Sequence, residues 1–294
     1  MYLNRINVVV TGLLIFSFFT SFSQNDFQGK AYYYSKTTVD MSNFGGGQLS
    51  EERKKQIADR MKSALEKTYV LTFNQSESMY DEEEKLDAPG QTGGNRFRFL
   101  NAAGGGGLLY KNVKSHKILQ EQEFLGKQFL VVDSLPKLDW QLGSETKTIG
   151  QYVCFRATAV KKVEGFDISN LGRRDRNTNT NETSKDSINT TKPDKPVEVT
   201  KEMIVTAWYT PQIPINQGPD GYWGLPGLIL EINADRTTIL CSKIVLNPAD
   251  KEEMKIPSKG KKVTKEEYNT IVQEKTDEMR EQRGGRGGGG RRNL

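Results

Sequence analysis

Residues 151–160 (QYVCFRATAV) limit the possible folds of this chain more than any other segment, because apolar and polar side chains alternate along them. Apolar residues recur at every second position from Val153 through Phe155 and Ala157 to Ala159, with Cys154 and Arg156 between them. A period of two is typical of a strand with unlike faces, one on a core and one toward solvent. Sheets of such strands are usually antiparallel.

Other segments rich in β-branched and aromatic residues recur at short intervals, and no helix separates successive strands in the manner of a βαβ unit. We expect strands or short groups of strands at residues 29–39, 71–80, 96–100, 108–134, 139–142 and 201–209, and a hairpin of 228–233 with 237–246 that turns at Ala234 and Asp235.

Two helices are predicted beside these strands. Ser50 caps residues 51–67, and Thr264 with Glu267 forms a capping box at the start of residues 264–283. The predicted fold is mainly β (α+β). It is a curved antiparallel sheet or half-barrel resembling periplasmic lipoprotein carriers, with helix 51–67 packed on one face and the C-terminal helix outside. A β-sandwich is the alternative.

The ends of the chain differ from its body. Residues 1–24 combine Arg5 with a short apolar run, which predicts a cleaved signal peptide and an exported protein, periplasmic or on the periplasmic face of the outer membrane. Residues 25–250 are expected to form one domain with a mobile polar insertion at 164–199. A charged linker and helix (251–283) and a disordered Gly/Arg tail (284–294) follow.

The formal net charge of +5 comes mainly from the C-terminal end, where residues 280–294 hold five arginines and a single acid, Glu281. The body therefore gives no electrostatic argument for binding nucleic acid. In an exported protein the arginine-rich tail is either an arm that contacts anionic lipid or an acidic partner, or an inert solubilising segment.

Residues 208–229 combine turn-forming prolines and glycines with four aromatic side chains. Pro226 followed by Gly227 predicts a type II turn with positive φ at Gly227, and Leu225, Leu228 and Leu230 are expected to point inward. The aromatic residues either form a binding platform for a sugar or peptide or pack over the loop and the end of the sheet. They are Trp208, Tyr209, Tyr222 and Trp223.

This stretch resembles the GLPGLI family of exported Bacteroidota envelope proteins. The residues that carry the resemblance are Gly224, Leu225, Pro226, Gly227, Leu228 and Ile229, with Gly218-Pro219, Trp208-Tyr209-Thr210 and the Tyr152-to-Thr158 strand as flanking matches. The resemblance implies an envelope protein of mostly unassigned function, and the genes of such proteins often neighbour those of TonB-dependent outer-membrane transporters. It implies no catalytic residues.

The two cysteines, Cys154 and Cys241, are each predicted on the more polar face of a strand, beside Arg156 and Lys243. They are either bridged, as an oxidising compartment favours, or two buried free thiols. His116, in a polar turn, is the only histidine and is expected at the surface.

No catalytic or metal-ligand motif is present in the sequence, so we expect no cofactor and no metal. The predicted function is non-enzymatic binding. The alternative is a periplasmic hydrolase whose site geometry cannot be seen in the sequence.

Overall fold

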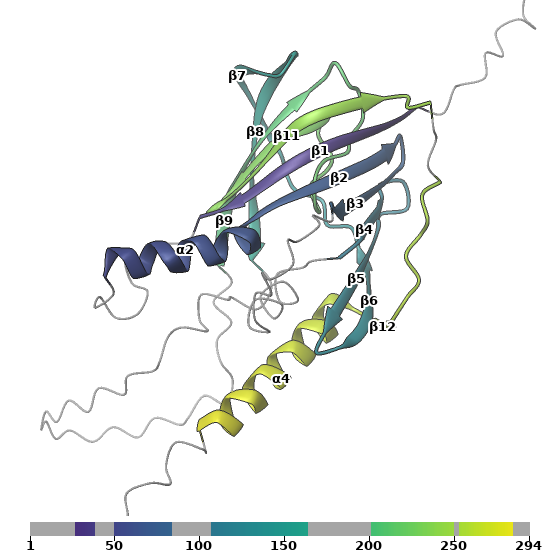
Figure 1. Ribbon diagram of the computed structural model, residues 1–294. Coiled ribbons are helices and arrows are strands. Elements are labelled where there is room, and N and C mark those ends of the chain that lie inside the picture. Colours follow the sequence, from purple (N-terminus) through teal and green to yellow (C-terminus); the bar gives the residue numbers. More distant parts are fainter. Residues whose placement is uncertain (1–26, 39–49, 84–106, 164–200, 250–252, 285–294) are drawn as a thin grey trace, which may run out of the picture.

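The computed structural model describes residues 27–38, 50–83, 107–163, 201–249 and 253–284, and its strands form one 12-stranded sheet (Figure 1). The strand order is β12-β6-β5-β4-β3-β2-β1-β11-β10-β9-β8-β7. All neighbours are antiparallel except β12 and β6. The strands are β1 (Gln28–Thr37), β2 (Glu66–Asn74), β3 (Glu77–Glu82), β4 (Leu109–Asn112), β5 (Lys117–Phe124), β6 (Lys127–Ser134), β7 (Gln141–Ile149), β8 (Tyr152–Val163), β9 (Lys201–Thr210), β10 (Leu228–Ala234), β11 (Thr237–Leu246) and β12 (Lys261–Val263), and the helices are α2 (Glu51–Leu65) and α4 (Lys265–Gly284).

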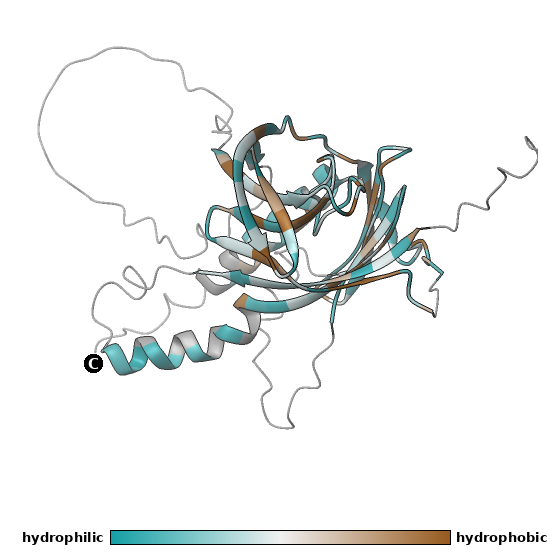
Figure 2. Ribbon diagram, turned by 90° about the horizontal axis from the view of Figure 1, so that it is seen from above, coloured by the Kyte–Doolittle hydropathy of each residue, from teal (hydrophilic) through white to brown (hydrophobic). Residues whose placement is uncertain are grey.

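The predicted curved antiparallel sheet is confirmed. The sheet curls strongly but stays open, because its end strands β7 and β12 are not paired with each other (Figures 1 and 2). A β-sandwich of two sheets does not form in the described residues. One detail differs: residues 71–80 are not one extended segment. The Asn74 side chain accepts hydrogen bonds from the backbone N–H groups of Ser76 and Glu77 and so turns the chain between β2 and β3.

The C-terminal helix, expected outside the domain, packs on the sheet instead. α4 packs on the sheet through Tyr268 and Val272, which contact Phe129 and Val131 of β6. α2 ends two residues earlier than predicted and continues directly into β2, and Figure 1 shows it extending beyond the end of the sheet. The capping box of α4 is confirmed, because Thr264 and Glu267 exchange side-chain-to-backbone hydrogen bonds of 2.9 and 3.1 Å.

The main core lies on one side of the sheet, which we call the inner face. Cross-strand partners continue it from strand to strand: Ala31 faces Leu71, Leu71 faces Tyr80, and Tyr80 faces Leu109. All of these side chains are buried. From the other end of the sheet, β8, β9 and β10 contribute Ala157, Ala207, Ile232 and their neighbours to the same cluster. The opposite side of the sheet is the outer face.

Several predicted segments lie outside the described residues: the signal sequence, the strand at 96–100, the insertion at 164–199 and the Gly/Arg tail. Within the described part of the chain, neither helix is long and apolar enough to cross a membrane.

Candidate functional site

The connection between β9 and β10, residues 211–227, folds back onto the inner face of β3 and β4. Hydrogen bonds within and next to this loop close it on itself: the N–H of Leu228 donates to the carbonyl oxygen of Ile213, and that of Ile229 donates to Gln217. The hydroxyl of Ser78 on β3 donates to the Gln217 side-chain oxygen at 2.9 Å. The loop is thus fixed to strands more than a hundred residues earlier in the chain.

Lys111 of β4 is the strongest anchor of the loop. Its side chain is fully buried, and its Nζ donates to the carbonyl oxygens of Gly218 (2.6 Å), Asp220 (2.5 Å) and Tyr222 (3.1 Å). Burial lowers the pKa of the Lys111 ammonium to about 7, and the Asp220 carboxylate opposes this shift. The main chain of residues 218–222 is therefore held around the Nζ atom of Lys111.

The Asp220 carboxylate lies close enough to act on three tyrosines that we call the tyrosine cluster: Tyr69, Tyr80 and Tyr222. The rings of Tyr69 and Tyr80 stack with their centroids 4.6 Å apart. Burial raises the pKa of all three hydroxyls, and the Asp220 carboxylate raises it further. Asp220 itself has φ of 49°, in the left-handed region that few non-glycine residues adopt. Its backbone is thus held in an uncommon conformation beside the cluster.

Two buried polar groups near the loop have no hydrogen-bond partner in the described structure: the hydroxyl of Tyr80 and the side-chain nitrogen of Gln217. Buried polar groups are normally paired, since each unpaired one costs on the order of 1–3 kcal/mol. Tyr33, a neighbour of Tyr80 at 6.3 Å between ring centroids, follows the rule and donates to the carbonyl oxygen of Ile229 at 2.6 Å. The region where the loop meets the inner face therefore holds buried polar groups that lack the hydrogen bonds such groups normally make.

The segment Gly224–Ile229 is structural in the way its leucines predict, because Leu225, Leu228 and Leu230 are all buried. The predicted positive φ at Gly227 is wrong; the positive φ is at Gly224, at 94°. The N–H of Gly227 donates to the carbonyl oxygen of Leu225, which makes a γ-turn centred on Pro226. Glycine is required at 227 for a different reason: a β-carbon there would lie 2.2 Å from the carbonyl oxygen of Thr210.

The four aromatic candidates do not form a surface platform. Tyr209, Tyr222 and Trp223 are buried, and Trp223 belongs to a small separate cluster with Val113 and Leu135. The indole N–H of Trp223 donates to the carbonyl oxygen of Pro136 at 2.7 Å. Trp208 alone is half-buried, and the Nζ of Lys147 lies 4.3 Å from its ring centroid on the outer face. For Tyr209, Tyr222 and Trp223, the second alternative applies, in which the rings pack over the loop and the end of the sheet.

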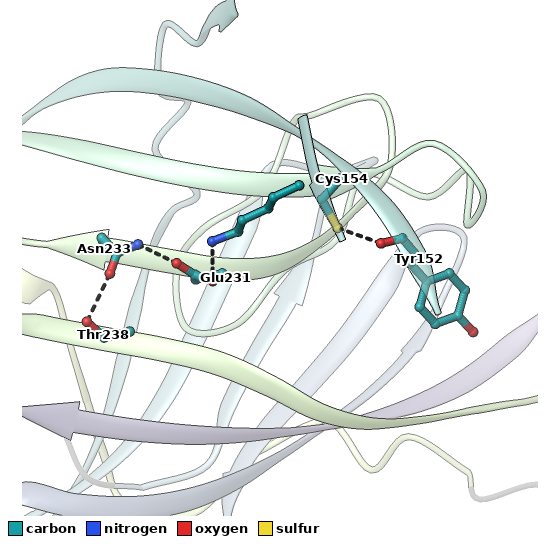
Figure 3. Close-up of polar contacts among 6 residues, drawn as sticks. Tyr152, Cys154, Glu231, Asn233 and Thr238 are labelled. Atoms are coloured by element: carbon teal, nitrogen blue, oxygen red, sulfur yellow. Dashed lines mark hydrogen bonds and ion pairs between the residues drawn. The ribbon is translucent and has the colours of Figure 1, made fainter. Parts of the chain in front are cut away.

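The outer face of β7 to β11 carries a row of polar side chains that satisfy one another (Figure 3). Lys147 donates to Glu231 at 2.6 Å, Asn233 donates to the same carboxylate at 2.7 Å, and Thr238 donates to Asn233 at 2.9 Å. We call these four residues the outer polar row. Each has its partner within the row, in contrast to the groups under the loop.

Both cysteines are buried free thiols, which is the second of the two alternatives. The expectation of a polar face is wrong for Cys241, whereas Cys154, although buried, lies directly opposite Lys147 of the outer face. On β11 the reason is a β-bulge: Cys241 pairs with Tyr33 and Lys243 with Tyr32, so Ser242 is an extra residue between them. Burial raises the pKa of the thiols to about 11 for Cys154 and about 12 for Cys241. On β8, Val153 is exposed where Cys154 is buried, but Ala157 and Ala159 are buried as predicted.

His116 is exposed, as expected, in the turn between β4 and β5.

The sequence patterns did not predict the roles of Lys111, Tyr80 and Gln217. Lys111 stands on a strand two residues after the apolar Leu109, and a lysine on the apolar side of an alternating strand was the available signal.

A family model described as "Protein of unknown function (Porph_ging)" matches residues 140–231. The match spans β7, β8, β9, the loop and the first part of β10, whereas Lys111 and Tyr80 lie outside it. No curated protein matches the chain.

Two solved structures are similar at low identity. "Structure of PNGF-II in C2 space group" has 12% identity and a TM-score of 0.45, covering 84% of this chain and 33% of that chain. "Structure of PNGF-II in P21 space group" has 12% identity and a TM-score of 0.44, with the same coverage. The chain thus spans about a third of the length of these proteins.

Proposed function

We propose that this chain is a non-enzymatic exported binding or accessory protein of the cell envelope, of the GLPGLI type, that works with a TonB-dependent outer-membrane transporter. The observation that carries the binding role is a pair of buried polar groups without a hydrogen-bond partner in the described residues, the Tyr80 hydroxyl on β3 and the Gln217 side-chain nitrogen in the loop that Lys111 holds in place. A ligand or partner that supplies their hydrogen bonds would recover the free energy that the unpaired groups cost.

The envelope location rests on residues 1–24, whose composition is that of a signal peptide. The partnership with a transporter rests on the resemblance of residues 208–229 to the GLPGLI family. The matched family model covers residues 140–231 and has no assigned function, so the activity has to be established by experiment.

Affinity capture from envelope membranes of the bacterium that makes the chain tests the proposal. The tagged mature chain is expected to retain a TonB-dependent barrel in near-stoichiometric amount, and an excess of untagged chain should compete it away. Recovery of no barrel, together with substrate turnover by the isolated monomer, would favour the periplasmic hydrolase and contradict the proposal.

Trp208 provides the variant for this capture experiment, because it is the half-buried member of the four aromatic candidates. Trp208→Ala is expected to weaken retention of the barrel while the chain stays folded. Trp223→Ala is the unsuitable choice, since the buried indole holds Pro136 and its loss would disturb the loop itself.

A further inference from the structure

The carboxylate of Asp220 accepts no hydrogen bond or ion pair from the described residues, although its main chain is fixed by Lys111. It is partly exposed, and its charge acts on the hydroxyls of the tyrosine cluster. Asp220 adopts its left-handed conformation in the middle of a buried hydrogen-bond network. An acceptor held this rigidly beside aromatic rings is arranged as binding sites arrange their polar groups.

The Tyr80 hydroxyl is the second, independent observation. Its side chain is only 5% exposed, and its oxygen has no partner in the part of the chain that the structure describes. Tyr80 stacks on Tyr69, which is half-buried, so one ring of the pair reaches toward solvent. A hydroxyl can both donate and accept, so the missing partner is a polar group of either kind.

Charges of both signs lie around the tyrosine cluster. The Nζ of Lys161 lies 4.7 Å from the ring centroid of Tyr222, and the ammonium of Lys111 lies beneath the loop. Lys67 and Glu82 form an ion pair of 2.7 Å at the ends of β2 and β3, where Glu82 faces Tyr69 across the strands. Asp220 therefore adds a negative charge where two lysines already lie. A cationic ligand would meet these ammonium groups, and an anionic ligand would meet Asp220 and Glu82.

We propose that Asp220 and the tyrosine cluster bind a neutral, polyhydroxylated ligand of the carbohydrate class. This inference rests on the proposed binding function and names the ligand of that site. Sugar hydroxyls donate to the Asp220 carboxylate and exchange hydrogen bonds with the Tyr80 hydroxyl, and the apolar face of a sugar ring packs on Tyr69. Because a charged ligand of either sign would meet a like charge here, hydrogen bonding and ring packing are the source of affinity.

The experiment measures binding of three neutral trisaccharides, maltotriose, mannotriose and chitotriose, to the full mature chain by isothermal titration calorimetry and ligand-observed NMR. Spermidine and citrate serve as cationic and anionic probes. At least one trisaccharide is expected to bind saturably, and neither charged probe should compete. No binding by any trisaccharide at millimolar concentration overturns the proposal, as does competition by spermidine.

Asp220→Asn is the decisive variant, because asparagine also tolerates a left-handed backbone. We expect at least a tenfold loss of trisaccharide affinity with little change in melting temperature. Asp235→Asn is the matched control: Asp235 also has positive φ, at 51°, but lies exposed in the β10–β11 turn, and its replacement should leave affinity unchanged. Equal affinity in the Asp220→Asn variant overturns the assignment.

Tyr80→Phe separates a ligand role from a structural one. Removing an unpaired hydroxyl should not lower the melting temperature, but affinity for the trisaccharide should fall about fivefold to tenfold. Unchanged affinity would overturn the role of this hydroxyl. Failure of sugar binding is distinguishable from failure of the proposed function, since capture of a TonB-dependent barrel is measured separately and needs no sugar.

Discussion

Polar side chains occur in two regions of this sheet, and the two differ in how completely they are paired. On the outer face, Lys147, Glu231 and Asn233 satisfy one another across neighbouring strands. On the inner face, Lys111 donates to main-chain carbonyls, and the Tyr80 hydroxyl has no hydrogen-bond partner in the part of the chain that the structure describes. The outer polar row is complete without any other molecule, whereas the inner region stabilises a loop and leaves polar groups available. This difference distinguishes ordinary sheet stabilisation from a candidate binding site.

The largest predicted effect is that of a substitution at Gly227, which would disturb the packing of the loop on the inner face. A β-carbon there would lie 2.2 Å from the oxygen and 2.5 Å from the carbon of the Thr210 carbonyl, both backbone atoms that cannot move independently. Gly227→Ala should lower the free energy of unfolding by about 3 kcal/mol, measured by urea denaturation. Gly221→Ala is the control in the same loop, because no atom lies within 4 Å of its added β-carbon. Equal stability of the two variants would contradict this account.

Removal of the Lys111 amino group should have the next largest effect. Lys111→Met keeps an unbranched side chain but leaves the carbonyl oxygens of Gly218, Asp220 and Tyr222 without their donor. The expected loss is about 2–3 kcal/mol in the free energy of unfolding at pH 8, since unpaired buried acceptors are costly. Chemical denaturation of both proteins measures it, and a difference near zero would show that water replaces the lysine.

The effect of Lys111 should also depend on pH. Its pKa is about 7 in the folded protein and near the ordinary 10.5 when unfolded, so the unfolded chain binds more protons between these values. Stability of the wild type therefore rises as pH increases from 7 toward 10, by up to about 1.4 kcal/mol per pH unit from this group. The Lys111→Met variant has no such titrating group. The difference in free energy of unfolding between the wild type and this variant should therefore grow between pH 7 and pH 9. A gap that narrows would contradict the shift.

The sequence predicted the features that depend on neighbours in the chain. Alternation identified β8, and the spacing of Thr264 and Glu267 identified the start of α4, because strand periodicity and helix caps involve only a few consecutive residues. The open curved sheet followed from the number and spacing of such strands.

The sequence did not predict what depends on contacts between distant segments. Lys111 contacts residues 107 to 111 positions later in the chain, so nothing near it indicates its partners. The extra residue Ser242 moves Cys241 to the inner face, and a bulge of this kind leaves no regular pattern. At Gly227 the residue type was understood as a turn signal, whereas the constraint is the approach of Thr210 from another part of the chain.

Two tyrosines sharpen the comparison between paired and unpaired groups within the inner core itself. Tyr33→Phe removes a 2.6 Å hydrogen bond and leaves the Ile229 carbonyl oxygen without that donor, so it should cost about 1 kcal/mol. Tyr80→Phe removes a hydroxyl that has no partner and should change the free energy of unfolding by less than about 0.5 kcal/mol, or raise it. Thermal and urea denaturation of both variants provide the measurement. If Tyr80→Phe were the more destabilising, its hydroxyl would be paired in solution.

The smallest predicted effect is in the outer polar row. The side chain of Lys147 is 33% exposed, so water screens the ion pair, and Asn233 still donates to the Glu231 carboxylate when the lysine is removed. Lys147→Met should therefore cost at most about 1 kcal/mol, well below Lys111→Met, although the two lysines lose the same group. Because surface ion pairs weaken in salt, the cost should shrink further in 1 M NaCl, whereas that of Lys111→Met should persist. Urea denaturation at low and high salt measures the loss of unfolding free energy for Lys147→Met and for Lys111→Met, which gives four values to compare. A larger cost at Lys147 would mean that the outer row, and not the inner clamp, holds this sheet together.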